Sequence, residues 1–184
     1  LIGDWGKGGR NGTTDKRRLI ELLPENTLNK NELDLDILER KGHKTKKLYQ
    51  MQVATAMGIY AASAYPQPSF LIALGDNFYD DGVQSSTDSL WNSLWKDVYL
   101  GYKGLNIPWY PVFGNHDYGY GATGVNAQLQ RYTEHTDDDI WVFPSTNYTK
   151  RFTIPGEGGG SVCIIFIDTT TLAPSVNRCC NQEG

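Results

Sequence analysis

Three short loops in this 184-residue chain carry residue types that can hold metal ions. Gly3-Asp4, Gly75-Asp76 and Gly114-Asn115 each follow directly after a run of apolar residues. A glycine at such a position lets the chain turn sharply, so that the next side chain points into a shared crevice. Carboxylates that converge without lysine or arginine among them repel one another and need cations, and their hard oxygen ligands suit Fe, Mn, Mg or Zn. The three loops therefore predict a metal site.

The chemistry that such a site favours is phosphoryl hydrolysis. Two metal ions held ~3.5–4 Å apart and bridged by a carboxylate stabilise both the attacking and the leaving oxygen of a phosphate ester. A single Gly-Asp or Asn-His pair at the end of a strand is usually only a turn. Three such pairs in order, with Tyr79 placed three residues after Asp76, favour a binuclear site over three unrelated turns.

The elements that must position these loops follow from the apolar pattern. Spacings of three and four predict helices over residues 45–64, 88–99 and 124–133. Strands are predicted over residues 70–74, 109–113, 150–154 and 162–168, and Leu1-Ile2 is interpreted as the end of a first strand that begins upstream. Thr87 or Asp88 would cap the second helix, and Pro111 predicts that its strand lies near a sheet edge.

The order of these elements predicts where the unusual polar residues gather. A β-loop-α-β-loop-α-β-loop order implies a largely parallel sheet with helices outside it. Ligands bind such sheets at the carboxyl ends of the strands. The residues expected at that rim are Asp4, Asp76, Tyr79, Asn115 and His116.

At this point the motifs resemble a known family. The segments Gly3–Gly6, Gly75–Tyr79 and Gly114–Asp117 are similar to the first three of five metallophosphoesterase blocks. Tyr79 narrows the resemblance to the purple acid phosphatases, closest to the small tartrate-resistant type. The resemblance continues to about Leu172 but is weak across residues 7–44, which we interpret as a surface insertion.

The resemblance implies a fold class as well as a site. It is an α/β fold, the metallophosphoesterase-type α/β/β/α sandwich. This chain would hold the N-terminal βαβαβ half and the strands that follow it. Residues 1–184 would form a single calcineurin-like metallophosphoesterase domain that is truncated at both ends.

The resemblance also implies a role for each rim residue. Asp4 would bind the first metal, expected to be Fe(III), and Asp76 would bridge both metals. Tyr79 would bind the ferric ion as a phenolate, which gives the family its purple colour. Asn115 would bind the second, divalent metal (Fe, Zn or Mn) through its carbonyl oxygen. His116 would hydrogen-bond the phosphate and help to protonate the leaving alkoxide.

A charge count agrees with these roles. Asp4, Asp76 and an ionised Tyr79 bring three negative charges against five positive charges from Fe(III) and a divalent metal. One bound hydroxide leaves the site slightly cationic, which attracts an anionic phosphate. The expected function is therefore an acid phosphatase that hydrolyses phosphate monoesters, either small molecules or phosphorylated proteins, by attack of a metal-activated hydroxide.

The family pattern is incomplete in this chain. Its last two blocks supply three histidine ligands from Gly-His and Gly-His-x-His sequences, whereas the histidines here are His43, His116 and His135. We expect those ligands in missing C-terminal sequence, and we expect this fragment alone to be inactive. Two alternatives stay open: a non-catalytic binding or scaffold module, and a phosphodiesterase or protein phosphatase of the same superfamily. Tyr79 argues against the latter, because those relatives usually lack the phenolate.

Composition narrows the partners and the compartment. The formal net charge of −4 does not indicate a basic surface for binding nucleic acid. No apolar run approaches the ~20 residues of a membrane helix. Possible glycosylation acceptors at Asn11 and Asn147, together with the loop pair Cys179-Cys180, favour a secreted or lysosomal/vacuolar protein. Cys163 lies in an apolar run and is predicted to be a buried thiol.

Several other residues are predicted to be structural. Trp91 and Trp95 are expected in the core rather than as a substrate platform. The remaining acidic residues near the motifs are expected to cap loops or to support the ligands: Asp80, Asp81, Asp117 and Asp168.

Overall fold

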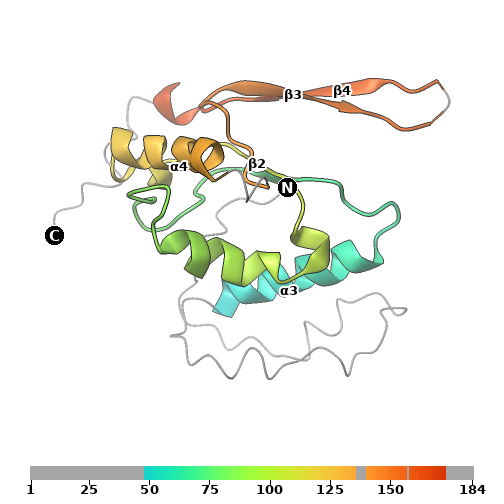
Figure 1. Ribbon diagram of the computed structural model, residues 1–184, viewed down its shortest axis with the longest axis horizontal. Helices are drawn as coiled ribbons and strands as arrows, with labels where there is room; N and C mark the ends of the chain where they lie inside the picture. Colours follow the sequence, from blue (N-terminus) through green and yellow to red (C-terminus); the bar gives the residue numbers. More distant parts are fainter. Residues whose placement is uncertain (1–47, 136–139, 157, 173–184) are drawn as a thin grey trace.

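The structure is a computed structural model, and it describes residues 48–135, 140–156 and 158–172 (Figure 1). Several sequence-based predictions fall outside these residues. They are the first strand with Asp4, the insertion at 7–44, Asn11 and the Cys179-Cys180 pair.

The elements occur in the predicted order. In chain order they are α3 (Leu48–Ser63), β1 (Leu71–Ala73), the π-helix η2 (Trp91–Leu100), the 3₁₀ turn η3 (Lys103–Leu105), β2 (Trp109–Pro111), the 3₁₀ turn η4 (His116–Tyr118), α4 (Ala122–Glu134), β3 (Tyr148–Thr153), β4 (Ser161–Phe166) and the 3₁₀ turn η6 (Thr170–Leu172). In Figure 1, α3 and η2 lie on one side of the β1–β2 pair and the β3–β4 hairpin lies on the other. No helix among these described residues is long and apolar enough to cross a membrane.

Small residues let α3 pack closely against the segment that follows η2. A Cβ atom at Gly58 would lie 2.4 Å from the ring of Tyr102, and one at Gly104 would lie 2.7 Å from the Cβ of Ala61. Gln50 ties the start of α3 to η2 by donating from Nε2 to the Leu94 carbonyl at 2.8 Å. The predicted helix over 45–64 is thus confirmed, and residues without bulk form much of its inner face.

The predicted second helix is a π-helix over most of its length. The N-cap position is Leu90, which has no side-chain cap, so the prediction that Thr87 or Asp88 is the N-cap is wrong; the Asp88 carboxylate instead accepts the backbone N–H of Leu90 at 2.9 Å, just before the helix. The aromatic residues at spacing four, Trp91, Trp95 and Tyr99, are all buried. Residues four apart share one side of a π-helix as they do of an α-helix, so the predicted buried face is confirmed although the helix type differs.

The first two described strands pair in parallel, as predicted. Leu71 lies opposite Trp109 and Ala73 opposite Pro111. Among the described residues β2 lies at the edge of the two-stranded sheet that it forms with β1, as Pro111 predicts, although an isolated bridge joins Trp109 to Trp141 on its other side. Trp109 accepts the Val142 N–H at 2.8 Å there. Pro111 lies two residues further along and has no N–H to donate on that side, so the bridge does not continue as a strand pairing.

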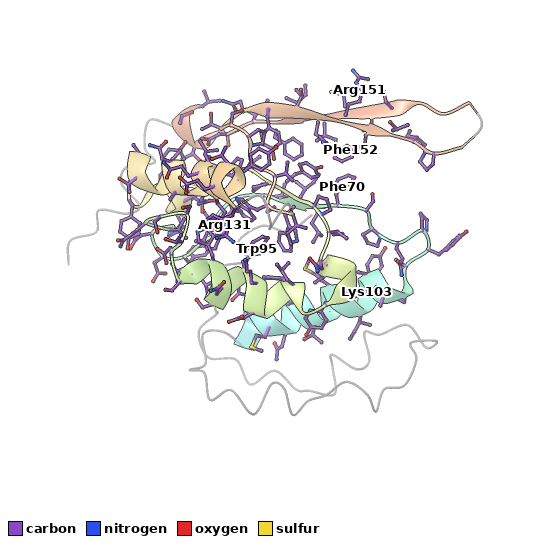
Figure 2. The ribbon with its side chains drawn as sticks, in the orientation of Figure 1. Phe70, Trp95, Lys103, Arg131, Arg151 and Phe152 are labelled. Carbon is purple, nitrogen blue, oxygen red and sulfur yellow. The ribbon has the colours of Figure 1, made fainter. Side chains whose placement is uncertain are left out.

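The last two strands form an antiparallel hairpin instead of extending the parallel pair. β3 and β4 are in register from Tyr148 opposite Phe166 to Thr153 opposite Ser161. One face of the hairpin, the inward face, packs on the strand layer formed by β1 and β2. It does so through Phe152, whose ring stacks on Phe70 with centroids 4.0 Å apart (Figure 2).

The thiol predicted to be buried lies on the other face of this hairpin. Cys163 is exposed, opposite Arg151, which points away from the body in Figure 2. Side chains alternate between the two faces of a strand, and only the face of Tyr148 and Phe152 meets the rest of the described chain. The apolar run around Cys163 is therefore not buried on both sides.

Candidate metal centre

The first motif loop that the structure describes, Gly75–Tyr79, adopts an unusual backbone at the carboxyl end of β1. Gly75 has φ = 93° and Asp76 has φ = 48°. Both lie in the left-handed region, which glycine enters freely and which aspartate tolerates better than most residues. A Cβ at Gly75 would lie 2.8 Å from the backbone nitrogen of Gly114, which begins the second motif loop. The glycine therefore lets the two loops touch.

This backbone turns the carboxylate of Asp76 toward the phenol of Tyr79. The Tyr79 hydroxyl donates to Asp76 Oδ2 at 2.5 Å. Asp76 is 9% exposed, so this carboxylate is nearly removed from water. Two oxygen atoms of the predicted ligand set are thus brought together by residues three apart on one loop.

The second motif loop that the structure describes, Gly114–Asp117, binds the same carboxylate. The backbone N–H of His116 donates to Asp76 Oδ1 at 3.0 Å. The His116 ring lies against the Tyr79 ring, with centroids 4.3 Å apart. Three of the predicted site residues, Asp76, Tyr79 and His116, therefore meet at the rim.

The orientation of the His116 ring selects the nitrogen that can reach a substrate. Its Nδ1 lies 2.6 Å from the carbonyl oxygen of Asp80. A carbonyl only accepts hydrogen bonds, so Nδ1 carries a proton and donates it. This leaves Nε2 as the ring nitrogen that can donate to a phosphate when the ring is charged.

Two further predicted ligands are Asn115 and Asp4. Asn115 stands between His116, which binds Asp76, and Gly114, where a Cβ atom would lie 2.3 Å from Asp76 Oδ1. The backbone of Asn115 is therefore at the site, while Asp4 lies outside the described residues. The metal-binding roles of both residues stay predictions.

Asp117 caps both loops, as its predicted loop-capping role requires. This carboxylate is 0% exposed. It accepts the backbone N–H groups of Asn77 at 3.0 Å, Phe78 at 3.2 Å and Gly114 at 2.9 Å. Burial raises the pKa of Asp117 to about 6, against the opposing effect of the hydrogen bonds that it accepts.

Gln128 is a site-supporting residue that the sequence analysis missed. It lies on α4, is fully buried, and donates from Nε2 to Asp117 Oδ1 at 2.8 Å. Its Oε1 accepts from Asn77 Nδ2 at 3.2 Å. The available signal was its position on the buried face of α4 beside Val125 and Arg131, where a polar side chain needs partners.

Asp168 acts at a second junction, between η4 and the end of the hairpin. It accepts a short hydrogen bond from the Tyr118 hydroxyl and caps η6 by accepting the Thr170 N–H at 2.9 Å. Burial, and then the bond to Asp168, raises the pKa of the Tyr118 phenol above its ordinary value. The predicted loop-capping role of Asp168 is confirmed.

The donor set of the described residues fits a hard, oxygen-liganded metal ion. Asp76 and Tyr79 offer a carboxylate and a phenol oxygen 2.5 Å apart, and Asn115 can add a neutral carbonyl. No group of three or more His, Cys, Asp and Glu side chains that could hold a metal occurs among residues 48–135, 140–156 and 158–172. These residues can therefore supply part of a coordination shell.

Comparison of the sequence with protein families identifies the class of protein to which these strand-end loops belong. Residues 2–173 match the family model for the calcineurin-like phosphoesterases. The chain belongs to this family, and its fold class is the predicted metallophosphoesterase type.

Within the family, the chain is similar to acid phosphatases. It is 39% identical over 114 residues to tartrate-resistant acid phosphatase type 5 of Oryctolagus cuniculus, an alignment that covers 62% of this chain and 33% of the relative. The protein of the same name from Sus scrofa is 33% identical over 132 residues, covering 72% and 37%. Purple acid phosphatase 3 of Arabidopsis thaliana is 36% identical over 121 residues, covering 66% and 29%. The chain thus matches roughly a third of the length of these curated relatives.

A solved structure shares the fold over nearly the whole chain. It is described as GAP50, the anchor in the inner membrane complex of Plasmodium, and superposes with a TM-score of 0.56 over 94% of this chain and 42% of that chain. The two sequences are 21% identical, so the likeness concerns the fold alone.

Proposed function

We propose that the full-length protein is an acid phosphatase that hydrolyses phosphate monoesters at a binuclear metal centre. The observation that carries the proposal is the pair formed by the Tyr79 hydroxyl and the Asp76 carboxylate, 2.5 Å apart at the carboxyl end of β1. A phenol has a pKa of about 10 and ligates at acid pH only if a strong Lewis acid removes its proton. Ferric iron meets that requirement, and the second metal would be divalent Fe, Zn or Mn.

The residues of this chain would divide the work around the metals. Asp76 would contact both ions, Tyr79 would bind the ferric ion and Asn115 the divalent ion. When bound, the two ions supply a hydroxide nucleophile and neutralise the charge that develops on the phosphate. His116, fixed through Nδ1 to the Asp80 carbonyl at 2.6 Å, would present Nε2–H to the phosphate and to the leaving oxygen.

The test is a spectrum and an assay on the same full-length protein. The wild type should hydrolyse a phosphate monoester at acid pH and show a broad visible absorption band when oxidised. Tyr79→Phe should abolish the band while iron remains bound, because the phenolate is the expected donor of the charge-transfer transition. Tyr120→Phe makes the same change at an exposed tyrosine and should keep the colour.

Three results would contradict the proposal. A colourless wild type with full iron occupancy would remove Tyr79 as a ligand. A metal-loaded protein without turnover would favour the non-catalytic binding or scaffold module as the function. Hydrolysis confined to phosphodiesters would contradict the phosphate-monoester substrate and favour a phosphodiesterase of the same superfamily.

A further inference from the structure

A buried carboxylate joins the two loops of the candidate metal centre. Asp117 lies on the second loop, yet it accepts backbone hydrogen bonds from Asn77 and Phe78 on the first. It also accepts the Gly114 N–H of its own loop at 2.9 Å. One fully buried side chain therefore joins the two loops by hydrogen bonds.

Gln128 of α4 closes this junction from the other side. Its amide group donates to Asp117 Oδ1 at 2.8 Å and accepts from Asn77 Nδ2 at 3.2 Å. The other Asn77 Nδ2 bond reaches the Val112 carbonyl at 2.9 Å, just after β2. Asp117, Asn77 and Gln128 thus form a closed ring of hydrogen bonds between β2, the first loop and α4.

Such a ring allows little freedom in the spacing of the loops. Each of its polar atoms is shielded from water, and a buried donor or acceptor that loses its partner costs about 1–3 kcal/mol. The backbone of Asp117 is held as well, because Gly82 and Gly124 approach its carbonyl oxygen closely enough that a Cβ at either would lie 2.9 Å from it. Moving one loop would break several contacts together.

We propose that Asp117 and Gln128 are positioning residues whose hydrogen bonds set the spacing between Asp76 on one loop and Asn115 and His116 on the other. The use of that spacing, the joint binding of two metal ions, rests on the function proposed above. Residues outside the coordination shell that orient metal ligands typically contribute roughly 10–100-fold to metal affinity or activity, and Asp117 and Gln128 would act in this way through Asn77 and the backbone of the two loops. Neither residue needs to touch a metal ion or a substrate to have this effect.

The test replaces the Gln128 amide by a side chain of similar length without hydrogen bonds. In full-length Gln128→Met, metal retention against a chelator and kcat should each fall roughly 10–100-fold. In the metal-free protein, backbone hydrogen exchange of peptides spanning 75–79 and 112–118 should become faster, because Asp117 and Asn77 lose a shared partner.

Two controls separate positioning from loss of stability. Gln130→Met makes the same change at an exposed site of α4 and should leave all three measurements unchanged. Leu129→Ala removes apolar contact with the core next to Gln128 and should lower the melting temperature without the selective increase in exchange. Gln128→Asn, which keeps the amide but is too short to reach both partners, replaces Gln128→Met if that variant does not fold.

The outcomes distinguish this inference from the proposed function. Unchanged exchange in the two loops, or an increase no greater than in Leu129→Ala, overturns the positioning role. Faster loop exchange with wild-type metal retention overturns it too, since the spacing would then not matter for the metals. A wild type that binds no metal overturns the proposed function, and the exchange measurement then decides by itself whether Asp117 and Gln128 set the spacing.

Discussion

At the scale of single residues, Asp76 has the most demanding position in the candidate site. Its φ of 48° is in the left-handed region, and its two carboxylate oxygens accept from different loops, Oδ2 from Tyr79 and Oδ1 from His116. Backbone conformations of this kind cost energy and persist where the surroundings hold them, often at functional sites. A carboxylate that accepts hydrogen bonds from two loops is well placed to contact two metal ions.

Asp76→Asn should be the most damaging conservative change in the proposed metal centre. The amide removes the charge and one of the two acceptors, so both ions should be lost together. Mass spectrometry of the full-length protein should find less than one metal per chain. Asp81→Asn, the same change at an exposed position of the same loop, should keep two metals. Two metals per chain in Asp76→Asn would show that Asp76 is not the bridge.

His116→Ala should slow the reaction but leave the metals in place. Its ring is held by the Asp80 carbonyl and by Tyr79, and the proposed proton donor is Nε2. The rate should fall on the order of 10²–10⁴-fold for alkyl phosphates, whose leaving groups need a proton, and less for nitrophenyl phosphate. Kinetics on both substrates with metal analysis provide the check. Loss of a metal, or equal slowing of both substrates, would assign His116 a different role.

At the scale of elements, the β3–β4 hairpin depends on one face for its attachment. The inward face carries Phe152, stacked on Phe70, and Tyr148, stacked on Phe166 and donating to the Pro111 carbonyl at 2.7 Å. The outward face carries Cys163 and Ile165, which are exposed. The hairpin is therefore held on the strand layer mainly by aromatic contacts near β2.

Phe152→Ala should weaken that attachment. Loss of the stacked pair and of the buried ring area should lower the free energy of unfolding by about 2 kcal/mol. Urea denaturation would measure the change. Arg151→Ala alters the adjacent residue on the outward face and should change stability by less than about 0.5 kcal/mol. Equal effects of the two substitutions would mean that the inward face does not hold the hairpin.

At the scale of the whole described molecule, aromatic side chains form the core that supports the strand-end loops. The ring of Trp141 lies 5.0 Å from Trp91 and 5.1 Å from Trp95, measured between centroids, and its backbone pairs with Trp109 of β2. Phe78 of the first motif loop contacts the same cluster. The core thus connects η2, β2 and the loop that bears Asp76.

Trp141→Ala should destabilise the protein as a whole. Removing this buried ring leaves a cavity between η2 and β2, and the free energy of unfolding should fall by about 3–5 kcal/mol. Equilibrium unfolding followed by fluorescence and circular dichroism would test it. Tyr60→Ala removes a largely exposed aromatic ring from α3 and should have a small effect. A loss below about 1 kcal/mol in Trp141→Ala would contradict the central place of this cluster.

Secretion, glycosylation at Asn147 and a lysosomal or vacuolar location stay predictions of the sequence. Asn147 is exposed and its Oδ1 accepts the Asp168 N–H at 2.9 Å. A glycan would attach to Nδ2 and leave that bond intact, so the fold is compatible with the modification.

The sequence by itself determined the family, the order of the elements and which loops form the candidate site. Apolar periodicity and the glycines of the motifs are local features, and they were sufficient to place Asp76, Tyr79 and His116 at one rim. The exposure of Cys163, the second neighbour of β2 and the role of Gln128 depend on contacts between residues far apart in the chain. An apolar run does not indicate which face of the strand will be buried. A glutamine on a helix does not indicate with which carboxylate it will form a hydrogen bond. Only the packing of α4 and the hairpin against the strand layer decided these points, because burial and hydrogen-bond partners are properties of the assembled fold.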